Sequence, residues 1–322
     1  MITYGSLASG IGGLDLAIEA NFDAKMLWKA EYDKYASQVH DKHWPNITNL
    51  HDITEVDWES VEPIDLLTGG YPCQPFSHAG YRKGFDDERN LWPHFAKAIH
   101  ILRPKYVFLE NVSGHLSLGF GQVLGDLAKE GYDAQWGVFA ASSVGAPHTR
   151  KRLFIFAWDR SDDEALFALR VRTRNLAISQ FAEENEIEQT DFRLLPTPVA
   201  RDAKGVTSRK DGILSALLAI KRSMPASPVF DFGPYQEGIN RWAKIRGNPP
   251  RPLIESYLNP EFVEWMMGFP IGWTEKIART KRVKALGNAV VSQQGSFALS
   301  CLASSCSVRG KKLAVFSTSD KQ

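Results

Sequence analysis

The first 160 residues or so alternate between apolar, strand-like runs and amphipathic segments with helical spacing. The strand-like runs begin with ITYGSLAS and continue through AKMLWKAEY, IDLLTGG and KYVFLENV to KRLFIFAW. Helix-like segments such as LDLAIEANF and NLWPHFAKAIHIL lie between them. Strands that alternate with helices predict an α/β fold with a largely parallel sheet covered by helices. In such sheets the carboxyl ends of the strands meet at one edge, where ligands bind.

The pattern becomes irregular after about residue 158. Residues 159–252 carry the acidic stretch EENEIEQTD and many prolines and glycines, with one clear predicted helix, GILSALLAIKRS. This change predicts a first domain at residues 1–159 and a second, smaller irregular domain at residues 160–273. Residues 274–322 are expected to return to the first domain, and KALGNAVVSQQGSFALSCLASSC within them predicts one long apolar helix.

The composition is that of an ordinary globular protein, with 43% hydrophobic and 23% charged residues in a chain of 322. No run approaches the roughly 20 apolar residues that cross a bilayer, and the N-terminus lacks a basic region followed by an apolar one. We therefore expect a cytoplasmic protein without membrane contact. The three cysteines form no CxxC pair, so we expect reduced thiols and no metal site.

The net charge of +1 does not exclude a nucleic-acid partner, because basic residues can gather on one face. Basic clusters occur at residues 148–152, 170–174, 244–251 and 279–284. Taken singly, each cluster is better explained by solvated surface charge than by a binding role.

A glycine-rich segment, SGIGG at residues 9–13, lies between the first strand and the first helix. Small residues there let a ligand approach the backbone near a helix N-terminus, although a structural turn explains the glycines equally well. Glu31 follows about twenty residues later at the end of the next strand, where a carboxylate accepts hydrogen bonds from ribose hydroxyls. Asp52, in HDIT, is placed to meet an adenine amino group. These residues together predict an adenosine derivative as ligand.

A second segment, TGGYPCQPFSHAG at residues 68–80, places Cys73 on a loop bounded by glycine and proline directly after a strand. Such a position exposes a side chain, whereas structural cysteines are usually buried. Glu110, in FLENV, follows another strand and is expected at the same edge of the sheet. A thiolate near a carboxyl group that donates a proton is the pair needed to attack an electron-poor ring.

These segments, in this order, resemble the motifs of the DNA (cytosine-5)-methyltransferases of bacterial and phage type. The resemblance runs over the whole chain, through SLASGIGGLDLAIEA, AEYDKYA, HDIT, GGYPCQPFSHAG, FLENV, GAPHTRKRLFIFAW, LNPEFVEWMMGFP and KALGNAVV. It implies a Rossmann-like, doubly wound S-adenosylmethionine-dependent methyltransferase sheet at residues 1–159. It also implies a target-recognition domain at residues 160–273.

The resemblance implies a mechanism residue by residue. Cys73 would attack C6 of cytosine, while Glu110 would contact the exocyclic amine and N3 and donate the proton that makes C5 nucleophilic. Arg152, with Arg150 beside it, would lie near the cytosine carbonyl and the cysteine loop, where positive charge also favours the thiolate.

The cofactor implied by the resemblance is S-adenosyl-L-methionine. The residues carried over to its site are Ile11, Gly13, Glu31, Tyr32, Asp52, Ile53, Pro72, Leu91, Asn288 and Val290. Tyr32 stands where the family often has tryptophan. Ala8 stands where the family usually has phenylalanine, and burying a side chain of that size is worth roughly 1.5–3 kcal/mol. This substitution is expected to weaken cofactor binding rather than catalysis.

The partner implied is double-stranded DNA, in which the target cytosine must be flipped out of the stack. LLPTPVARDAKG and KIRGNPPRP supply arginines on loops framed by glycine and proline and are the candidates for DNA contact, although an ordinary surface loop explains either stretch alone nearly as well. A monomer is expected, with a cognate restriction endonuclease acting on the same site as a further possibility. Three alternatives are an RNA-directed relative, a non-catalytic DNA-binding protein and a nicotinamide dehydrogenase, but the last leaves the Pro-Cys-Gln loop without a role.

Overall fold

The computed structural model describes residues 1–71, 90–162, 193–204, 212–223 and 230–305. Pro72 and Cys73 therefore lie outside the described residues. The first part of the chain forms β1 (Ile2–Leu7), α1 (Gly13–Asn21), β2 (Ala24–Ala30), α2 (Lys34–His43), β3 (Thr48–Asn49), β4 (Leu66–Gly69), α3 (Trp92–Leu102), β5 (Tyr106–Val112), α4 (Phe120–Lys129), β6 (Tyr132–Ala140) and β7 (Lys151–Asp159).

These strands form one seven-stranded sheet in the order β3-β2-β1-β4-β5-β7-β6. β1 to β5 pair in parallel, while β7 runs antiparallel between β5 and β6. The sequence of strands changes direction at β1: β2 and β3 follow on one side of it, and β4 and β5 follow on the other. The α/β class with a doubly wound, Rossmann-like sheet is confirmed.

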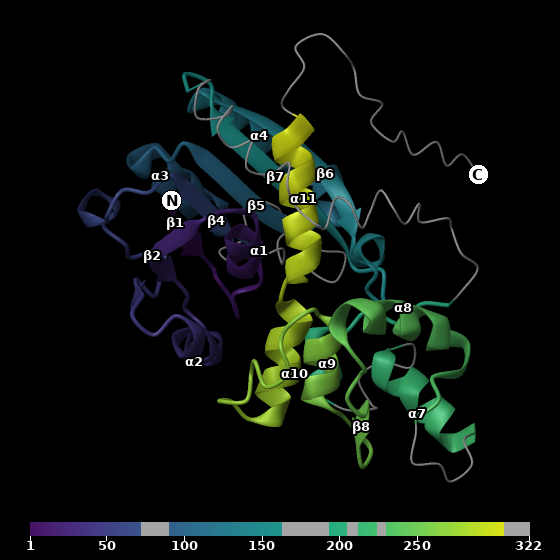
Figure 1. Cartoon of the computed structure of the whole chain (residues 1–322). Coiled ribbons are helices and arrows are strands. Elements are labelled where there is room, and N and C mark those ends of the chain that lie inside the picture. The colour runs from purple at the N-terminus through teal and green to yellow at the C-terminus, as the bar shows by residue number, and fades with distance from the viewer. Residues whose placement is uncertain (72–89, 163–192, 205–211, 224–229, 306–322) are drawn as a thin grey trace.

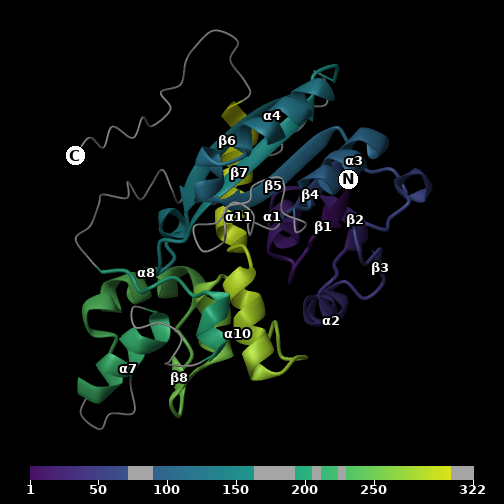
Figure 2. The same ribbon diagram turned by 180° about the vertical axis from the view of Figure 1, so that it is seen from behind.

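The two faces of the sheet are covered by different helices because successive side chains of a strand point to opposite sides. Tyr106 and Phe108 of β5 pack in one hydrophobic cluster with residues of α1 and of α11 (Ser292–Ser305). These two helices lie in front of the sheet in Figure 1. Val107 and Leu109, the alternate residues of β5, pack with α3 and α4, which lie in front of the sheet in Figure 2. A sheet buried on both faces explains why its strands read as nearly continuous apolar runs.

The second part of the chain lies below the sheet in Figure 1. It contains α7 (Ile213–Ser223), α8 (Gln236–Arg246), the two-stranded ribbon of β8 (Leu253–Ile254) and β9 (Tyr257–Leu258), α9 (Pro260–Met266) and α10 (Arg279–Asn288). These elements share one hydrophobic core with residues of the first part, among them Ile11, Val39 and Ala146. The two parts are thus continuous through buried apolar side chains.

The C-terminal apolar segment contains two helices instead of the single predicted one. α10 ends at Asn288 and α11 begins at Ser292, with Ala289 in extended conformation between them. The β-branched pair Val290 and Val291 favours extended backbone, and this link runs beside the glycine-rich segment. β6 ends at Ala140, where a 3₁₀ turn at Ala141–Val144 follows.

None of the helices among the described residues is long and apolar enough to cross a membrane.

Candidate active site

The glycine-rich segment joins β1 to α1 through residues with left-handed backbone. Ala8, Gly10 and Gly12 have φ values of 47°, 57° and 88°. A left-handed turn at this point lets the chain reverse direction within five residues and start α1 at Gly13. The amide of Gly10 points at Glu31 and donates a hydrogen bond of 2.6 Å to its Oε2.

Glu31 is held at the end of β2 by a set of local hydrogen bonds. Its other oxygen, Oε1, accepts from the amide of Asp33 at 2.8 Å. Asn49 on β3 fixes its backbone, accepting from the Glu31 amide and donating to the Glu31 carbonyl. Burial raises the pKa of Glu31 to about 7, and the two amide hydrogen bonds only partly oppose this rise.

Gly13 lies against the link between α10 and α11. A Cβ atom on Gly13 would fall 2.5 Å from the carbonyl oxygen of Val290, which is closer than any side chain permits. Because Gly13 has no side chain, the backbone of the glycine-rich segment can lie directly against the backbone of Val290.

Glu110 and Arg152 form an ion pair across two neighbouring strands. In the β5–β7 register Glu110 lies opposite Phe154 and Arg152 opposite Val112, so the two charged residues are diagonal neighbours on one face. Nε of Arg152 lies 2.8 Å from Oε1 of Glu110, and the side chains are only 19% and 12% exposed. Burial raises the pKa of Glu110, and Arg152 and Arg150 offset part of that rise.

Glu110 and its neighbour Asn111 both contact the chain just before the cysteine loop. The Asn111 amide donates a 3.1 Å hydrogen bond to the carbonyl of Tyr71. A Cβ atom on Gly70 would lie 3.2 Å from Oε2 of Glu110. The chain segment that leads into Cys73 is thus held against β5 at the level of the Glu110 carboxyl group.

The Arg150 side chain is buried between the first and second parts of the chain. Its guanidinium donates to the carbonyls of Pro198, Gly287 and Ala289 at distances of 2.5–3.3 Å. His148, also fully buried, bonds through Nε2 to the carbonyl of Met266, and burial lowers its pKa to about 3. Both side chains tie the first part of the chain to the second.

One cleft of about 350 Å³ joins these features. Its described lining comprises Ala8, Ser9, Gly10, Ile11, Gly13, Leu14, Glu31, Asp33, Ala36, Gly70, Tyr71, Glu110, Asn111, Val112, Arg152, Ala285, Gly287, Asn288, Ala289 and Val290. The predicted residues Ile11, Gly13, Glu31, Asn288 and Val290 therefore come together with Glu110 and Arg152. Ile11 contributes mainly backbone, because its residue exposure is 1%.

Four predicted cofactor residues are not part of this lining. Tyr32, directly after Glu31, is 79% exposed, and Leu91 is the N-cap residue of α3 and packs against the hydrophobic core below that helix. Ile53 is buried in the same core. Asp52 accepts two hydrogen bonds from Thr54, which lower its pKa. These residues surround the strand ends without meeting at one point.

A second cavity of about 520 Å³ adjoins the cleft at Arg152. It is lined by Arg152, Val199, Ala200, Arg201, Gly287 and Asn288. Val199 and Ala200 pack so closely on α10 that a Cβ atom on Gly287 would fall 2.1 Å from the Ala200 amide nitrogen. Arg201, in the predicted DNA-contacting loop LLPTPVARDAKG, is exposed there.

Sequence reasoning missed Asn111, Asp33 and the backbone role of Gly70. Asn111 stands in the same FLENV motif as Glu110, but its amide is identified as an anchor only when Tyr71 is seen opposite it. Within the described part of the chain, no group of three or more His, Cys, Asp or Glu side chains is placed to hold a metal ion.

The doubly wound sheet, with a glycine turn, an acidic residue after β2 and a carboxyl–guanidinium pair at the same edge, defines a Rossmann-like methyltransferase. Residues 2–216 match the family described as C-5 cytosine-specific DNA methylase. Because this match spans more than half of the sequence, the chain belongs to that family of enzymes.

Curated relatives agree with this assignment, and a solved structure agrees with the fold. The chain is 26% identical over 295 residues to the Type II methyltransferase M1.ScrFI of Lactococcus lactis subsp. cremoris, covering 88% of this chain and 73% of that protein. It is 35% identical over 162 residues to the Type II methyltransferase M.Bsp6I of Bacillus sp. (strain RFL6), where it spans about half of each protein, 48% and 51%. The fold is similar to that of the S. pombe Dnmt2 methyltransferase, with a TM-score of 0.59, 18% identity and coverage of 96% and 100%.

Proposed function

We propose that the protein methylates C5 of cytosine in a specific duplex DNA sequence, through a covalent bond between Cys73 and C6 of a flipped-out base. The observation that carries the proposal is the Glu110–Arg152 pair, 2.8 Å apart, at the end of a cleft that continues to Glu31 and the glycine-rich segment. The Asn111 hydrogen bond to Tyr71 supports it, because it holds the chain two residues before Cys73 beside that pair.

The carboxyl group of Glu110 suits the role of proton donor. Burial raises its pKa, so a larger fraction is protonated near neutral pH than for an exposed glutamate. In the proposed reaction the Cys73 thiolate forms a bond to C6, and the electrons of the C5–C6 double bond form a new double bond between C4 and C5. The electrons of the C4–N3 double bond move to N3, which takes the proton of Glu110. The resulting enamine is nucleophilic at C5. After methylation, removal of the C5 proton and expulsion of Cys73 restore the aromatic ring.

The cleft fits S-adenosylmethionine, which when bound supplies the methyl group. The Glu31 carboxylate would accept the ribose hydroxyls, since each oxygen is already oriented by one backbone amide. The close approach of Gly13 to Val290 leaves a smooth backbone surface at the other wall. Asn288 and Val290 would complete that wall, while Tyr32, Asp52, Ile53, Pro72 and Leu91 remain proposed contacts around the adenosine end.

We assign different roles to the two arginines. Arg152, beside Glu110, would contact the cytosine carbonyl and stabilise negative charge on Cys73. Arg150 would act as a positioning residue, because its guanidinium donates to three backbone carbonyls, and two of them, those of Gly287 and Ala289, lie where α10 meets the link to α11.

We further propose that residues 160–273 recognise the DNA target. The exposed Arg201, which lines the cavity next to Arg152, is placed for a phosphate or a guanine edge near the flipped base. Arg251, in KIRGNPPRP, is also exposed. The Type II names of the relatives support a cognate restriction endonuclease as a functional partner.

The proposal is tested by expressing the protein in a methylation-free bacterial host and sequencing bisulfite-treated host DNA. We expect one short motif to carry 5-methylcytosine in nearly every copy, and a Glu110→Gln control to leave it unmodified. Mass spectrometry of the host RNA distinguishes the RNA-directed alternative. Unmodified DNA from a folded protein, with or without modified RNA, would contradict the proposal.

A further inference from the structure

An indole from the second part of the chain holds the glycine-rich segment. Trp273 follows α9, and its Nε1 donates a 2.8 Å hydrogen bond to the carbonyl of Ile11. Trp273 is 7% exposed, so this hydrogen bond is shielded from water. Residues 262 positions apart in the sequence are thereby joined at the cleft.

The Ile11 side chain and the backbone of Gly12 also pack against the region around Trp273. The Ile11 side chain belongs to the hydrophobic core that Trp273 shares with α9 and α10. At the next residue, a Cβ atom on Gly12 would fall 2.5 Å from the ring of Trp44, which meets Trp273 edge to face. The two tryptophans thus contact the segment at Ile11 and Gly12 and are not part of the described lining of the cleft.

Trp273 itself is held rigidly by contacts on both sides. The ring of His43 stacks on it at a centroid distance of 3.4 Å, and Nε2 of His43 donates to the Trp273 carbonyl at 2.9 Å. Burial lowers the pKa of His43, which keeps the imidazole neutral near neutral pH. From α9, the Glu264 carboxylate accepts from the amides of Gly272 and Thr274 at 2.7 and 2.8 Å.

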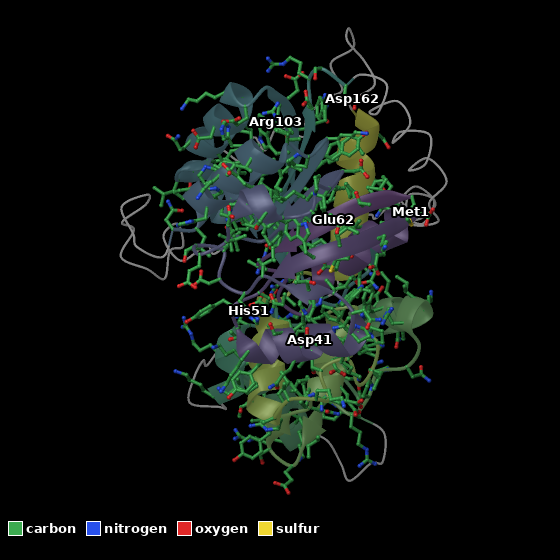
Figure 3. The ribbon with its side chains drawn as sticks, turned by 90° about the vertical axis from the view of Figure 1, so that its left-hand side faces the viewer. Met1, Asp41, His51, Glu62, Arg103 and Asp162 are labelled. Atoms are coloured by element: carbon green, nitrogen blue, oxygen red, sulfur yellow. The ribbon has the colours of Figure 1, made fainter. Side chains whose placement is uncertain are left out.

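Figure 3 views the molecule from the side that carries α2, with Asp41 labelled on that helix next to the second part of the chain. His43 at the end of α2 and Trp273 are therefore part of one packed contact that runs from the second part, past α2, to the segment after β1. On the sheet side, the same segment is held by hydrogen bonds from the Ser9 hydroxyl to the Ser6 carbonyl and from the Gly10 amide to Glu31.

We propose that Trp273 is a positioning residue for cofactor binding: its indole hydrogen bond to Ile11 fixes the backbone that faces the adenosine derivative. The proposal rests on the proposed function, in which this segment binds S-adenosylmethionine. A loose segment has to be ordered at the moment of binding, and the entropy lost then weakens affinity. The affinity for the cofactor thereby depends on a residue of the second part of the chain, outside the seven-stranded sheet and its helices.

The test is Trp273→Phe, which keeps an aromatic ring against His43 but removes the N–H donor. Titration calorimetry with S-adenosylhomocysteine is expected to show about five- to tenfold weaker binding, the effect of leaving one buried carbonyl without its donor. In kinetics, KM for S-adenosylmethionine rises by a similar factor, while kcat and KM for DNA stay within twofold. Amide hydrogen exchange without ligand becomes faster at residues 9–14.

Trp265→Phe is the matched control. Its indole Nε1 donates to the carbonyl of Gly247 at 2.8 Å in the same core, away from the glycine-rich segment. It should lower thermal stability about as much as Trp273→Phe but leave the Kd and the exchange at residues 9–14 unchanged. Equal effects of the two variants, or an unchanged Kd in Trp273→Phe, would overturn the proposal.

These measurements distinguish a failure of the proposed function from a failure of the coupling between Trp273 and the glycine-rich segment. Wild-type protein that does not bind S-adenosylhomocysteine would contradict the proposed function, and the exchange comparison, which needs no ligand, would still decide the coupling. If Trp273→Phe does not unfold cooperatively, His43→Phe replaces it. That variant keeps a stacked ring but loses the hydrogen bond to the Trp273 carbonyl, and a Kd or exchange rate at residues 9–14 identical to wild type would refute the coupling.

Discussion

Replacing Arg150 by methionine separates the structural arginine from the chemical one. The Arg150 guanidinium is buried and donates to the carbonyls of Pro198, Gly287 and Ala289. Methionine fills a similar volume but offers no donor, so three buried carbonyls lose a partner. The C-terminus of α10 also loses a cation that its carbonyl dipoles favour.

The expected loss of stability follows from these contacts. A buried polar group left without its partner costs about 1–3 kcal/mol, and removing the guanidinium also removes the cost of burying it. Taking about 1 kcal/mol, the lower end of this range, for each of the three carbonyls gives a decrease of about 3 kcal/mol in the free energy of unfolding. For a protein of this size the thermal midpoint is then expected to fall by roughly 4–5 °C.

The assay is thermal and urea unfolding of the wild type, Arg150→Met and Arg152→Met, followed by methyl transfer well below each midpoint. We expect Arg150→Met to be unstable but active within about tenfold of wild type. Arg152→Met should stay within about 1 kcal/mol in stability, because Glu110 can then take up a proton. Arg150→Met with unfolding free energy within 1 kcal/mol of wild type would refute the structural role.

Three further predictions follow from the cleft. Arg152→Met lowers kcat by about 10²–10³, the usual effect of losing a charge that stabilises a reacting group, and an unaltered kcat would contradict its role. Affinity for S-adenosylhomocysteine rises about fivefold from pH 6 to pH 8, because the Glu31 pKa of about 7 makes the accepting carboxylate predominate only above it; calorimetry of Glu31→Gln should show no such slope. Gly13→Ala weakens this binding more than about tenfold, since its Cβ meets the Val290 carbonyl at 2.5 Å, whereas Gly121→Ala, with open space around it, leaves the Kd unchanged.

The sheet and its functional edge were predictable because they depend on local periodicity. Apolar runs at strand length and amphipathic segments at helical spacing are properties of neighbouring residues. Because the carboxyl ends of parallel strands meet at one edge of the sheet, residues that follow these strands can be assigned to that edge. Glu31, Glu110 and the glycine-rich segment were therefore placed on the correct edge of the sheet. The α/β class follows from the same signals, whereas the family was predicted from the resemblance of the motifs.

The division of labour between Arg150 and Arg152 was not predictable from their sequence positions. The two residues are separated by one position, and only the tertiary structure shows that Arg152 pairs with Glu110 while Arg150 reaches the end of α10. The break between α10 and α11 has the same origin. Residues 284–306 have helical spacing throughout, but the link at residues 289–291 is extended where it passes Gly13.

Contacts across long sequence separations explain what else was missed. Trp273 occurs in an apolar segment that reads as ordinary core, and nothing near it in sequence indicates Ile11 as its partner. The core that joins α8, α9 and α10 to the first part of the chain likewise depends on packing between distant residues.

The most direct test of the account is covalent trapping on DNA that carries 5-fluorocytosine at the motif found by bisulfite sequencing. Fluorine at C5 prevents loss of the C5 substituent, so the enzyme stays bonded to C6 after methyl transfer. We predict a complex that survives denaturation, with the DNA attached to the peptide that contains Cys73, and none with Cys73→Ser. A trapped complex that persists in Cys73→Ser, or one that maps to Cys301 or Cys306, would contradict the account.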